Sequence, residues 1–155
     1  MMSKSLARVV AAMQAAGVAG VPLEMAAETR TAAQAAAAAG CVLDQIVKSI
    51  IFGGESGLYL FLTAGGNQVD NARASALAGE ALGRADANQV RAVTGFAIGG
   101  VSPLGHLTPL PLWMDPALLA FPQVWAAAGT PRHIFAIPPG QLQRITGAKV
   151  AEFTA

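Results

Sequence analysis

Residues 94–106, TGFAIGGVSPLGH, exclude a long helix or strand from this part of the chain. Within seven residues, Gly99, Gly100 and Gly105 surround Pro103. Glycine tolerates a positive φ and close approach of other atoms, while proline fixes its own φ and lacks an amide proton. The segment therefore predicts a stiff loop. Its bare amides suit a phosphate or a carbonyl oxygen, although a buried double turn between two strands explains the same residues.

Periodic apolar residues and capping residues predict short helices on both sides of this loop. Leu6, Val9, Val10 and Met13 recur at helical spacing before Gly17. Thr31 with Gln34 matches a capping box, and its alanine-rich helix ends at Gly40. Further helices are predicted at residues 71–82 after Asp70, from Asp86 to about Gly95, after Asp115–Pro116, and at 141–145.

Runs of β-branched and apolar residues predict the strands. Residues 46–52 and 58–63 flank GGESG and indicate a hairpin. Other predicted strands are 21–25, 110–114, 124–128, 133–137 and 149–153, and Pro138 and Pro139 end the strand at 133–137. No linker or internal repeat interrupts the pattern. We therefore expect a single domain over residues 1–155 with a mixed α/β fold.

The composition restricts the class of partner. Apolar residues make up 54% of the chain and charged residues 12%, with a net charge of +1. No broad basic face of the kind that binds duplex DNA is expected, so contact with a nucleic acid would be local. Cys41 is the only cysteine, which fits the reducing cytoplasm. The N-terminal segment predicts a helix rather than a signal peptide, and no apolar run reaches the length of a membrane span.

The residues of common catalytic and metal sites are missing. His106 and His133 are the only histidines, and neither has metal-ligand spacing with Cys41 or a carboxylate. The chain has no G-x-S-x-G elbow, phosphate-binding P-loop or dinucleotide fingerprint. We therefore expect no metal and no cofactor, and a triad hydrolase is not favoured.

Lys48 is the most informative charged residue because it interrupts the apolar run 46–52. Strand alternation places it on the face shared with Ile46 and Ile50. If that face is buried, the ammonium must meet an anion or a water-filled cleft, because burying it alone is costly. If Lys48 lies at a strand edge, its stem can instead carry the charge out to solvent.

Four segments together carry a family resemblance: TGFAIGGVSPLGH, the IVKSIIF run around Lys48, NQVDNARASALAG at residues 67–79, and AAGTPRHIFAIPPGQLQRITGAKVAEF near the end. With these motifs, nearly the whole chain resembles the YbaK/EbsC family of aminoacyl-tRNA deacylases and the related editing domain of bacterial prolyl-tRNA synthetases. The resemblance implies a central mixed, barrel-like β-sheet surrounded by helices.

The resemblance also implies the site. Lys48 would orient the terminal nucleotide of tRNA, and the amides around Gly99, Gly100, Val101 and Gly105 would position the ester carbonyl or the attacking water. The implied substrate-binding residues are Thr63, Ser102, Pro103, His106, Asp115, Gly129 and Thr130. From the residues alone, a bond within its own turn explains the Ser102 hydroxyl better than a role as pocket hydroxyl or nucleophile, and a turn cap explains His106 at least as well as a substrate contact.

The expected function is that of a free-standing trans-editing hydrolase that removes a small amino acid from mischarged tRNA, with tRNA for proline as one candidate carrier. Its expected partners are the tRNA acceptor end and a synthetase, in the cytoplasm. The branch specific for cysteinyl-tRNA carries an aspartate near the position of Ile134 here, which disfavours that substrate. The alternative is a non-catalytic module that binds an aminoacyl or nucleotide ligand beside a synthetase.

Overall fold

The fold is organised around a mixed sheet with the strand order β1-β7-β6-β2-β3-β5-β8, and β4 pairs with β2 outside this path. The computed structural model describes residues 2–155, so residue 1 of the predicted domain lies outside the described residues. The strands are β1 (Leu23–Glu24), β2 (Ile46–Gly54), β3 (Gly57–Ala64), β4 (Gly83–Arg84), β5 (Leu112–Met114), β6 (Val124–Ala127), β7 (His133–Ile137) and β8 (Lys149–Val150).

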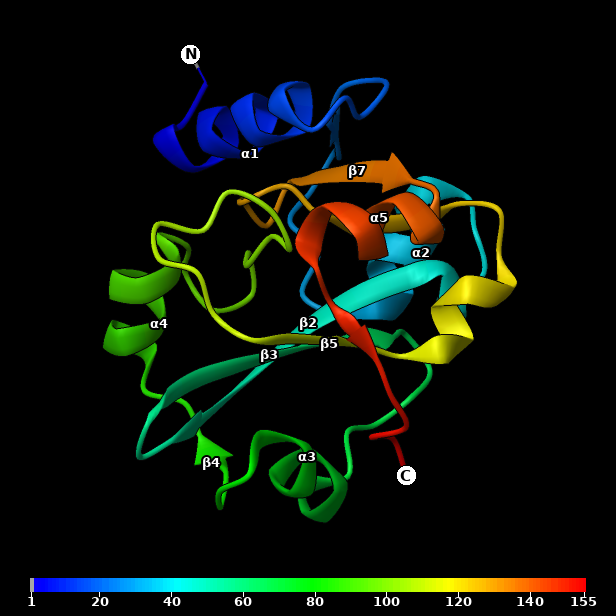
Figure 1. The fold of residues 1–155 in the computed structure, drawn as a ribbon. Helices are drawn as coiled ribbons and strands as arrows, with labels where there is room; N and C mark the ends of the chain where they lie inside the picture. The colour runs from blue at the N-terminus through cyan, green and yellow to red at the C-terminus, as the bar shows by residue number, and fades with distance from the viewer. Residues whose placement is uncertain (1) are drawn as a thin grey trace.

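Helices cover the sheet on its outer faces, with α1 at one end of the molecule and α3 at the other (Figure 1). The α-helices are α1 (Lys4–Ala15), α2 (Ala32–Ala39), α3 (Asn71–Ala78), α4 (Ala87–Thr94) and α5 (Pro139–Thr146). Two short 3-10 helices, η1 (Leu43–Gln45) and η2 (Pro116–Ala120), complete the chain. The predicted mixed α/β fold, with a central mixed sheet and outer helices, is confirmed. Within residues 2–155, no helix has the length and apolar character required to cross a bilayer.

The predicted hairpin is present and forms the centre of the sheet. β2 and β3 pair along their whole length, and the register sets Lys48 opposite Thr63 and Ile50 opposite Phe61. β5 adds to β3 in parallel, and β6 adds to the start of β2 in parallel. Because β3 lies between two strands, nearly all of its residues are buried.

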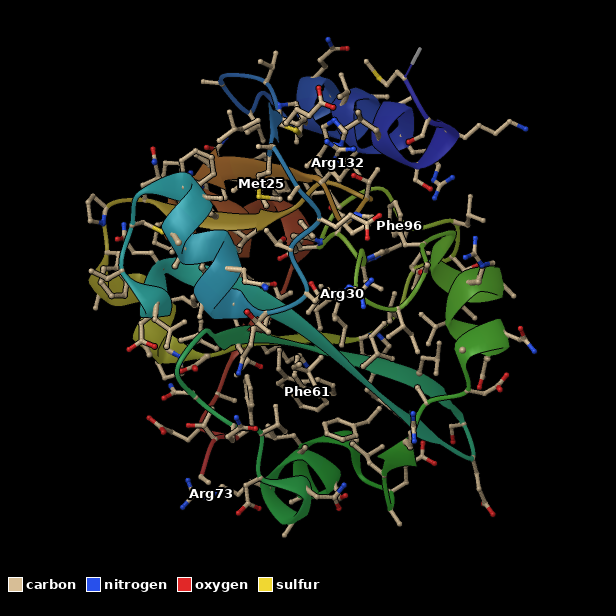
Figure 2. The ribbon with its side chains drawn as sticks, turned by 180° about the vertical axis from the view of Figure 1, so that it is seen from behind. Met25, Arg30, Phe61, Arg73, Phe96 and Arg132 are labelled. Carbon is tan, nitrogen blue, oxygen red and sulfur yellow. The ribbon has the colours of Figure 1, made fainter. Side chains whose placement is uncertain are left out.

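Alternation along β3 separates the two larger of the three hydrophobic clusters. Leu60 and Leu62 point to the larger cluster, which also contains Phe96 and residues of α1. Phe61 points the other way, where its ring stacks on Trp113 at 5.1 Å between centroids and meets Phe153 edge-on at 5.0 Å. Figure 2 shows Phe61 and Phe96 on opposite sides of the β2–β3 hairpin. Burying each such ring contributes about 1.5–3 kcal/mol.

The helix starts follow the predicted capping residues. Thr31 and Gln34 form the complete capping box before α2, and Gly40 ends that helix in the left-handed conformation. Asp70 accepts from the amide of Arg73 at the start of α3. Asp86 caps α4 by accepting from the amide of Gln89. These local side-chain bonds satisfy amides that have no partner within the helix.

Several predicted boundaries are wrong. The helix predicted at 71–82 ends at Ala78, because Gly79 turns left-handed and its amide bonds to Ser75 O, and residues 83–84 then pair with β2. The strands predicted at 21–25, 110–114 and 149–153 cover only 23–24, 112–114 and 149–150. The helix predicted at 141–145 begins at Pro139, since proline at the first helical position has no amide to satisfy.

The glycine-rich loop after α4 is fixed at both ends by Arg8 of α1. The guanidinium donates from Nη2 to Gly95 O at 2.7 Å and from Nε to Gly105 O at 3.2 Å. It also lies 4.7 Å from the ring centroid of Phe96, a cation–π distance. Gly105 has φ +80°, and a Cβ there would lie 3.2 Å from Arg8 O. The Arg8 side chain therefore joins the two ends of the loop and holds the loop against α1.

A second set of bonds makes the loop interior rigid. The amide of Leu104 donates to Ser102 Oγ at 3.1 Å, and His106 Nε2 donates to Ser102 O at 2.6 Å. Burial lowers the pKa of His106 below its ordinary value, and the nearby Arg8 charge lowers it further, while the bond to Ser102 opposes the shift. His106 is therefore a neutral donor that closes the turn.

This arrangement predicts an acid-sensitive stability. Since the folded pKa of His106 is depressed, the unfolded chain binds the proton more readily, and the contribution of His106 is complete above about pH 6.5 and is lost as the pH falls through the folded pKa. His106→Gln, whose amide can still donate to Ser102 O, should weaken this dependence. Urea unfolding at pH 7.5 and pH 5.0 measures it. An equal loss of unfolding free energy in both proteins would contradict the assignment.

Candidate functional site

A gap in strand pairing opens along one edge of β2. On that edge β6 pairs only with Ile46 and Val47, and β4 pairs only with Phe52 and Gly53. On this edge, no strand among the described residues pairs with residues 48–51, which β3 pairs on the opposite edge. The exposed backbone edge of a strand is a ready hydrogen-bonding surface. The gap therefore offers both side chains and main-chain groups to a ligand.

A cleft of about 240 Å³ lies at this gap and is called the main cleft below. Its walls come from β2, from residues 125–127 of β6, from the start of β7, from residues 29–35 at α2, and from the glycine-rich loop. Ala35, Ile46 and Trp125 pack together as an apolar part of the lining, and Lys48 and Arg30 are its charged residues. The lining is Thr29, Arg30, Thr31, Ala32, Ala35, Ile46, Val47, Lys48, Ser49, Ile50, Gly99, Val101, Trp125, Ala126, Ala127 and Ile134.

Two neighbouring hollows meet the main cleft at Gly99. The first, of about 250 Å³, lies towards Arg84 and Ile98. The second, of about 330 Å³, includes Glu28, Arg30 and Gly129. Gly99 has φ +94° and open space around the position of a Cβ. The glycine at this junction therefore provides a backbone conformation that other residues adopt only with strain.

Lys48 lies in the main cleft, held by a chain of hydrogen bonds. Its Nζ donates to Asn67 O at 2.5 Å, and Asn67 Nδ2 donates to Asp115 Oδ2 at 2.9 Å. Burial lowers the pKa of Lys48, and the charges of Asp115 and Asp44 partly oppose this shift. The ammonium has three donors, so two remain for a ligand after the bond to Asn67.

Fewer residues of the glycine-rich loop line the main cleft than predicted. Gly99 and Val101 line the main cleft, and their amides have no acceptor within residues 2–155. The amide of Gly100 instead donates to Ala97 O at 3.0 Å, closing a turn. A Cβ on Gly100 would lie 3.4 Å from the backbone of Thr130, so this residue packs against the β6–β7 turn. The two amides that flank Gly100 are thus the available donors.

The other predicted loop residues do not reach the main cleft. Gly105 packs on α1, at the far end of the loop, because Arg8 holds it there. Ser102 is fully buried, and its hydroxyl accepts the amide of Leu104 in its own turn. His106 closes the same turn, and Pro103 is buried beside it. These four residues shape the loop and do not line the cleft.

The remaining predicted residues support the site from behind or border the neighbouring hollow. Thr63 is buried and donates to Phe61 O. Asp115 is 2% exposed, and its carboxylate accepts from the amides of Ala64 and Ala117 as well as from Asn67. Gly129 borders the hollow that holds Glu28. Thr130 Oγ1 accepts the amide of Arg132 and bonds to His133 Nδ1, which fixes the β6–β7 turn.

Of the predicted site residues, only Lys48, Gly99 and Val101 line the main cleft, and the lining residues that sequence reasoning missed include Arg30, Ser49 and Trp125. Ser49 Oγ is buried and is without a hydrogen-bond partner in the described part of the chain. A buried hydroxyl without a partner is costly and is rare in folded proteins. Ser49 adjoins Lys48 in β2, and this adjacency was the available signal for it. Arg30 and Trp125 carried no comparable signal, because only the tertiary fold brings them beside Lys48.

The acid–base residues near the cleft do not form a metal site or an activated thiol. No group of three or more His, Cys, Asp or Glu side chains suited to a metal ion occurs in residues 2–155. Cys41 is a free, half-buried cysteine, and burial raises the pKa of its thiol. A thiol with a raised pKa is a poor nucleophile at neutral pH.

Comparisons with known proteins find relatives that align with most of this chain. A 31% identical relative, the uncharacterized protein YwhH of Bacillus subtilis strain 168, aligns over 121 residues, or 77% of each chain. A crystal structure of a candidate trans-editing enzyme for prolyl-tRNA synthetase superposes with a TM-score of 0.94 at 47% identity, covering 100% of this chain and 99% of that one. The hypothetical protein APE2540 has a TM-score of 0.87 and 31% identity, covering 96% and 99%.

A family model described as the aminoacyl-tRNA editing domain matches residues 26–145, which include every residue that lines the main cleft. The match covers well over half of the chain and extends from the segment before α2 almost to the end of α5. This protein therefore belongs to the aminoacyl-tRNA editing domain family.

Proposed function

We propose that this protein is a metal-independent aminoacyl-tRNA deacylase that acts in trans, as a single domain, on tRNA mischarged with a small amino acid. The observation that carries the proposal is the meeting of Lys48 with the free amides of Gly99 and Val101 in one cleft. Membership of the editing-domain family supports the reaction class, and the likeness to a candidate trans-editing enzyme supports action outside a synthetase.

The loop amides supply the electrostatic part of this reaction. Water attacks the ester carbonyl carbon, the bond to the ribose oxygen breaks, and that oxygen takes the proton released by the water. Negative charge develops on the carbonyl oxygen, where fixed amide donors lower the barrier. Gly99 and Val101 present such donors on a loop that Arg8 and His106 hold rigid. An aminoacyl ester is already activated, so the absence of a triad is no obstacle.

Lys48 and Ser49 orient the end of the substrate. The ammonium of Lys48 stays bonded to Asn67 O and directs its other protons to the terminal nucleotide. The unpartnered hydroxyl of Ser49 gains a partner when the ribose or the attacking water enters. A vicinal ribose hydroxyl serves as the proton relay that the protein itself does not provide. Holding the reacting groups together in this way lowers the entropic part of the barrier.

The apolar part of the cleft selects the amino acid by the size of its side chain. Ala35, Ile46 and Trp125 enclose it beneath α2. Attraction to an apolar pocket separates side chains differing by one methylene by only about 1–3 kcal/mol. Steric exclusion is more effective, since a side chain too large for the space is rejected. Alanyl and seryl esters fit this proposal better than aromatic ones.

The partner proposed from this site is the acceptor end of tRNA, with the synthetase that produces the error as a second partner and the cytoplasm as the compartment. The cleft volume of about 240 Å³ is below the 300–1,000 Å³ of clefts that enclose drug-sized ligands. It accommodates an amino acid and part of a ribose, while the rest of the acceptor strand lies outside. A purely binding module would use the same cleft, and multiple turnover of mischarged tRNA distinguishes the two.

Lys48→Met tests the active-site lysine. Because the variant removes the ammonium and keeps most of the apolar stem, deacylation of alanyl-tRNA should fall by about a hundredfold or more, the usual cost of losing one electrostatic group. The melting temperature should not fall, since burial disfavours the charged form of Lys48. The matched control is Lys149→Met, an exposed lysine at the edge of the sheet. Near-normal turnover by folded Lys48→Met would refute the assignment.

Chelation tests the proposed independence from metals and thiols. Prolonged treatment with EDTA should leave the rate of alanyl-tRNA hydrolysis unchanged, and Cys41→Ser should retain at least about half of it, since the thiol is not activated. Both are measured as initial rates under multiple turnover. Loss of activity on chelation that one added metal restores would require a different mechanism.

Ala35→Leu tests selection by size. The wild-type protein should hydrolyse alanyl and seryl esters and spare phenylalanyl esters. Ala35 is buried and lines the cleft, so a leucine there should abolish hydrolysis of even the alanyl ester. Ala38→Leu, on the exposed face of the same helix, should not. Overpacking itself costs about 1–3 kcal/mol of stability. The melting temperatures of both variants therefore show whether a loss of activity comes from a filled cleft or from unfolding. Equal hydrolysis of alanyl and phenylalanyl esters by the wild type would exclude the size filter.

A further inference from the structure

The main cleft is lined by two cations and by no carboxylate. Lys48 and Arg30 are the charged residues of its lining. The chain as a whole carries 10 basic and 9 acidic residues, so this local imbalance is not a consequence of a basic protein. A cleft with one sign of charge raises the local concentration of an oppositely charged ligand. The lining therefore favours an anionic group.

The two cations differ in how far their charge is already compensated. Lys48 donates to Asn67 O and feels the negative charges of Asp115 and Asp44. Arg30 is exposed, and its guanidinium has neither a hydrogen-bond nor an ion-pair partner within residues 2–155. Three other arginines of the chain, Arg8, Arg73 and Arg132, each donate to backbone carbonyls. Arg30 is the cation of the cleft that retains its full hydrogen-bonding capacity.

The backbone that carries Arg30 is held in place. Its amide donates to Gln34 Oε1 at 2.8 Å, and the amide of Thr29 donates to Pro131 O at 2.9 Å. Figure 2 shows Arg30 between α2 and the glycine-rich loop. Its side chain borders both the main cleft and the hollow that contains Glu28. The carboxylate of Glu28 repels an anion from that hollow, which leaves the main-cleft side of Arg30 for the anion.

We infer that Arg30 binds a backbone phosphate of the acceptor strand, next to the terminal nucleotide, and thereby positions the ester in the main cleft. This inference rests on the proposed function. Arginine suits a phosphate because its planar guanidinium donates two parallel hydrogen bonds. Lys48, which is less exposed than Arg30 and is already bonded to Asn67, then remains available to bind the ribose. Arg30 is a positioning residue in this scheme and does not touch the reacting atoms.

The first experiment measures binding and does not depend on catalysis. Fluorescence anisotropy measures the binding of an RNA minihelix that ends in single-stranded CCA and carries no amino acid. The minihelix is titrated with wild type, Arg30→Gln and Arg30→Lys at salt concentrations from ~50 to ~200 mM. Each phosphate contact on a single strand contributes about 0.7 to the slope of log affinity against log salt. Arg30→Gln should lower that slope by about 0.7, and Arg30→Lys should largely restore it.

The matched control is Arg91→Gln, because Arg91 is an exposed arginine of α4 outside the cleft lining. Its slope should equal that of the wild type. A slope for Arg30→Gln that equals the wild-type value, or an equal decrease in both variants, would overturn the inference. So would the absence of minihelix binding by the wild type. Arg30 is exposed, so its substitution should not change the melting temperature.

The second experiment compares two substrates that share the ester and differ in phosphate. Arg30→Gln should lower kcat/KM for an alanyl minihelix, mainly through KM, and should leave hydrolysis of alanyl-adenosine, which has no phosphate, unchanged. An equal decrease on both substrates would overturn the inference, because Arg30 would then act on the ester. If the wild type hydrolyses neither substrate, the proposed function fails, while the salt slope still decides whether Arg30 contacts phosphate.

Discussion

The incomplete pairing of β2 is the constraint on which the site depends. β3 covers one edge of this strand completely, while β6 and β4 share the other edge and leave residues 48–51 uncovered. A strand paired on both edges could not present its backbone N–H and C=O groups to a ligand. The same strand therefore forms the centre of the sheet and a wall of the cleft. The stable hairpin with β3 holds this wall in place even though one edge is open.

The loop opposite β2 is rigid because bonds from distant parts of the chain replace regular secondary structure. Arg8 ties Gly95 and Gly105 to α1, and His106 closes the turn at Ser102. With its ends fixed in this way, the loop contributes Gly99 and Val101 to the lining of the cleft. Donors that are already placed cost little reorganisation during a reaction. The buried polar residues of the loop thus contribute by fixing its geometry, and they do not line the cleft.

Charge is distributed sparingly in and around the cleft. Asp115 caps η2, accepts the amide of Ala64 and holds Asn67, whose carbonyl holds Lys48. One buried carboxylate therefore serves both the fold and the position of the lysine. Arg30 lies outside this network, and its guanidinium has no partner within residues 2–155. In the proposed function, this nearly neutral protein recognises an anionic polymer through a few contacts, with a correspondingly modest dependence on salt.

The sequence by itself determined the elements whose signals are local: the capping residues of the helices, the β2–β3 hairpin, the mixed α/β class, the glycine-rich loop and the unusual position of Lys48. Only the tertiary structure decided which of these residues share a cleft. Several predicted strand boundaries were wrong, because strand pairing such as that of residues 83–84 with β2 is non-local. Ser102, His106 and Gly105 lie away from the cleft because their polar groups bond within the loop or to Arg8. Arg30 and Trp125 entered the cleft because α2 and β6 pack beside β2, and no spacing along the chain records that contact.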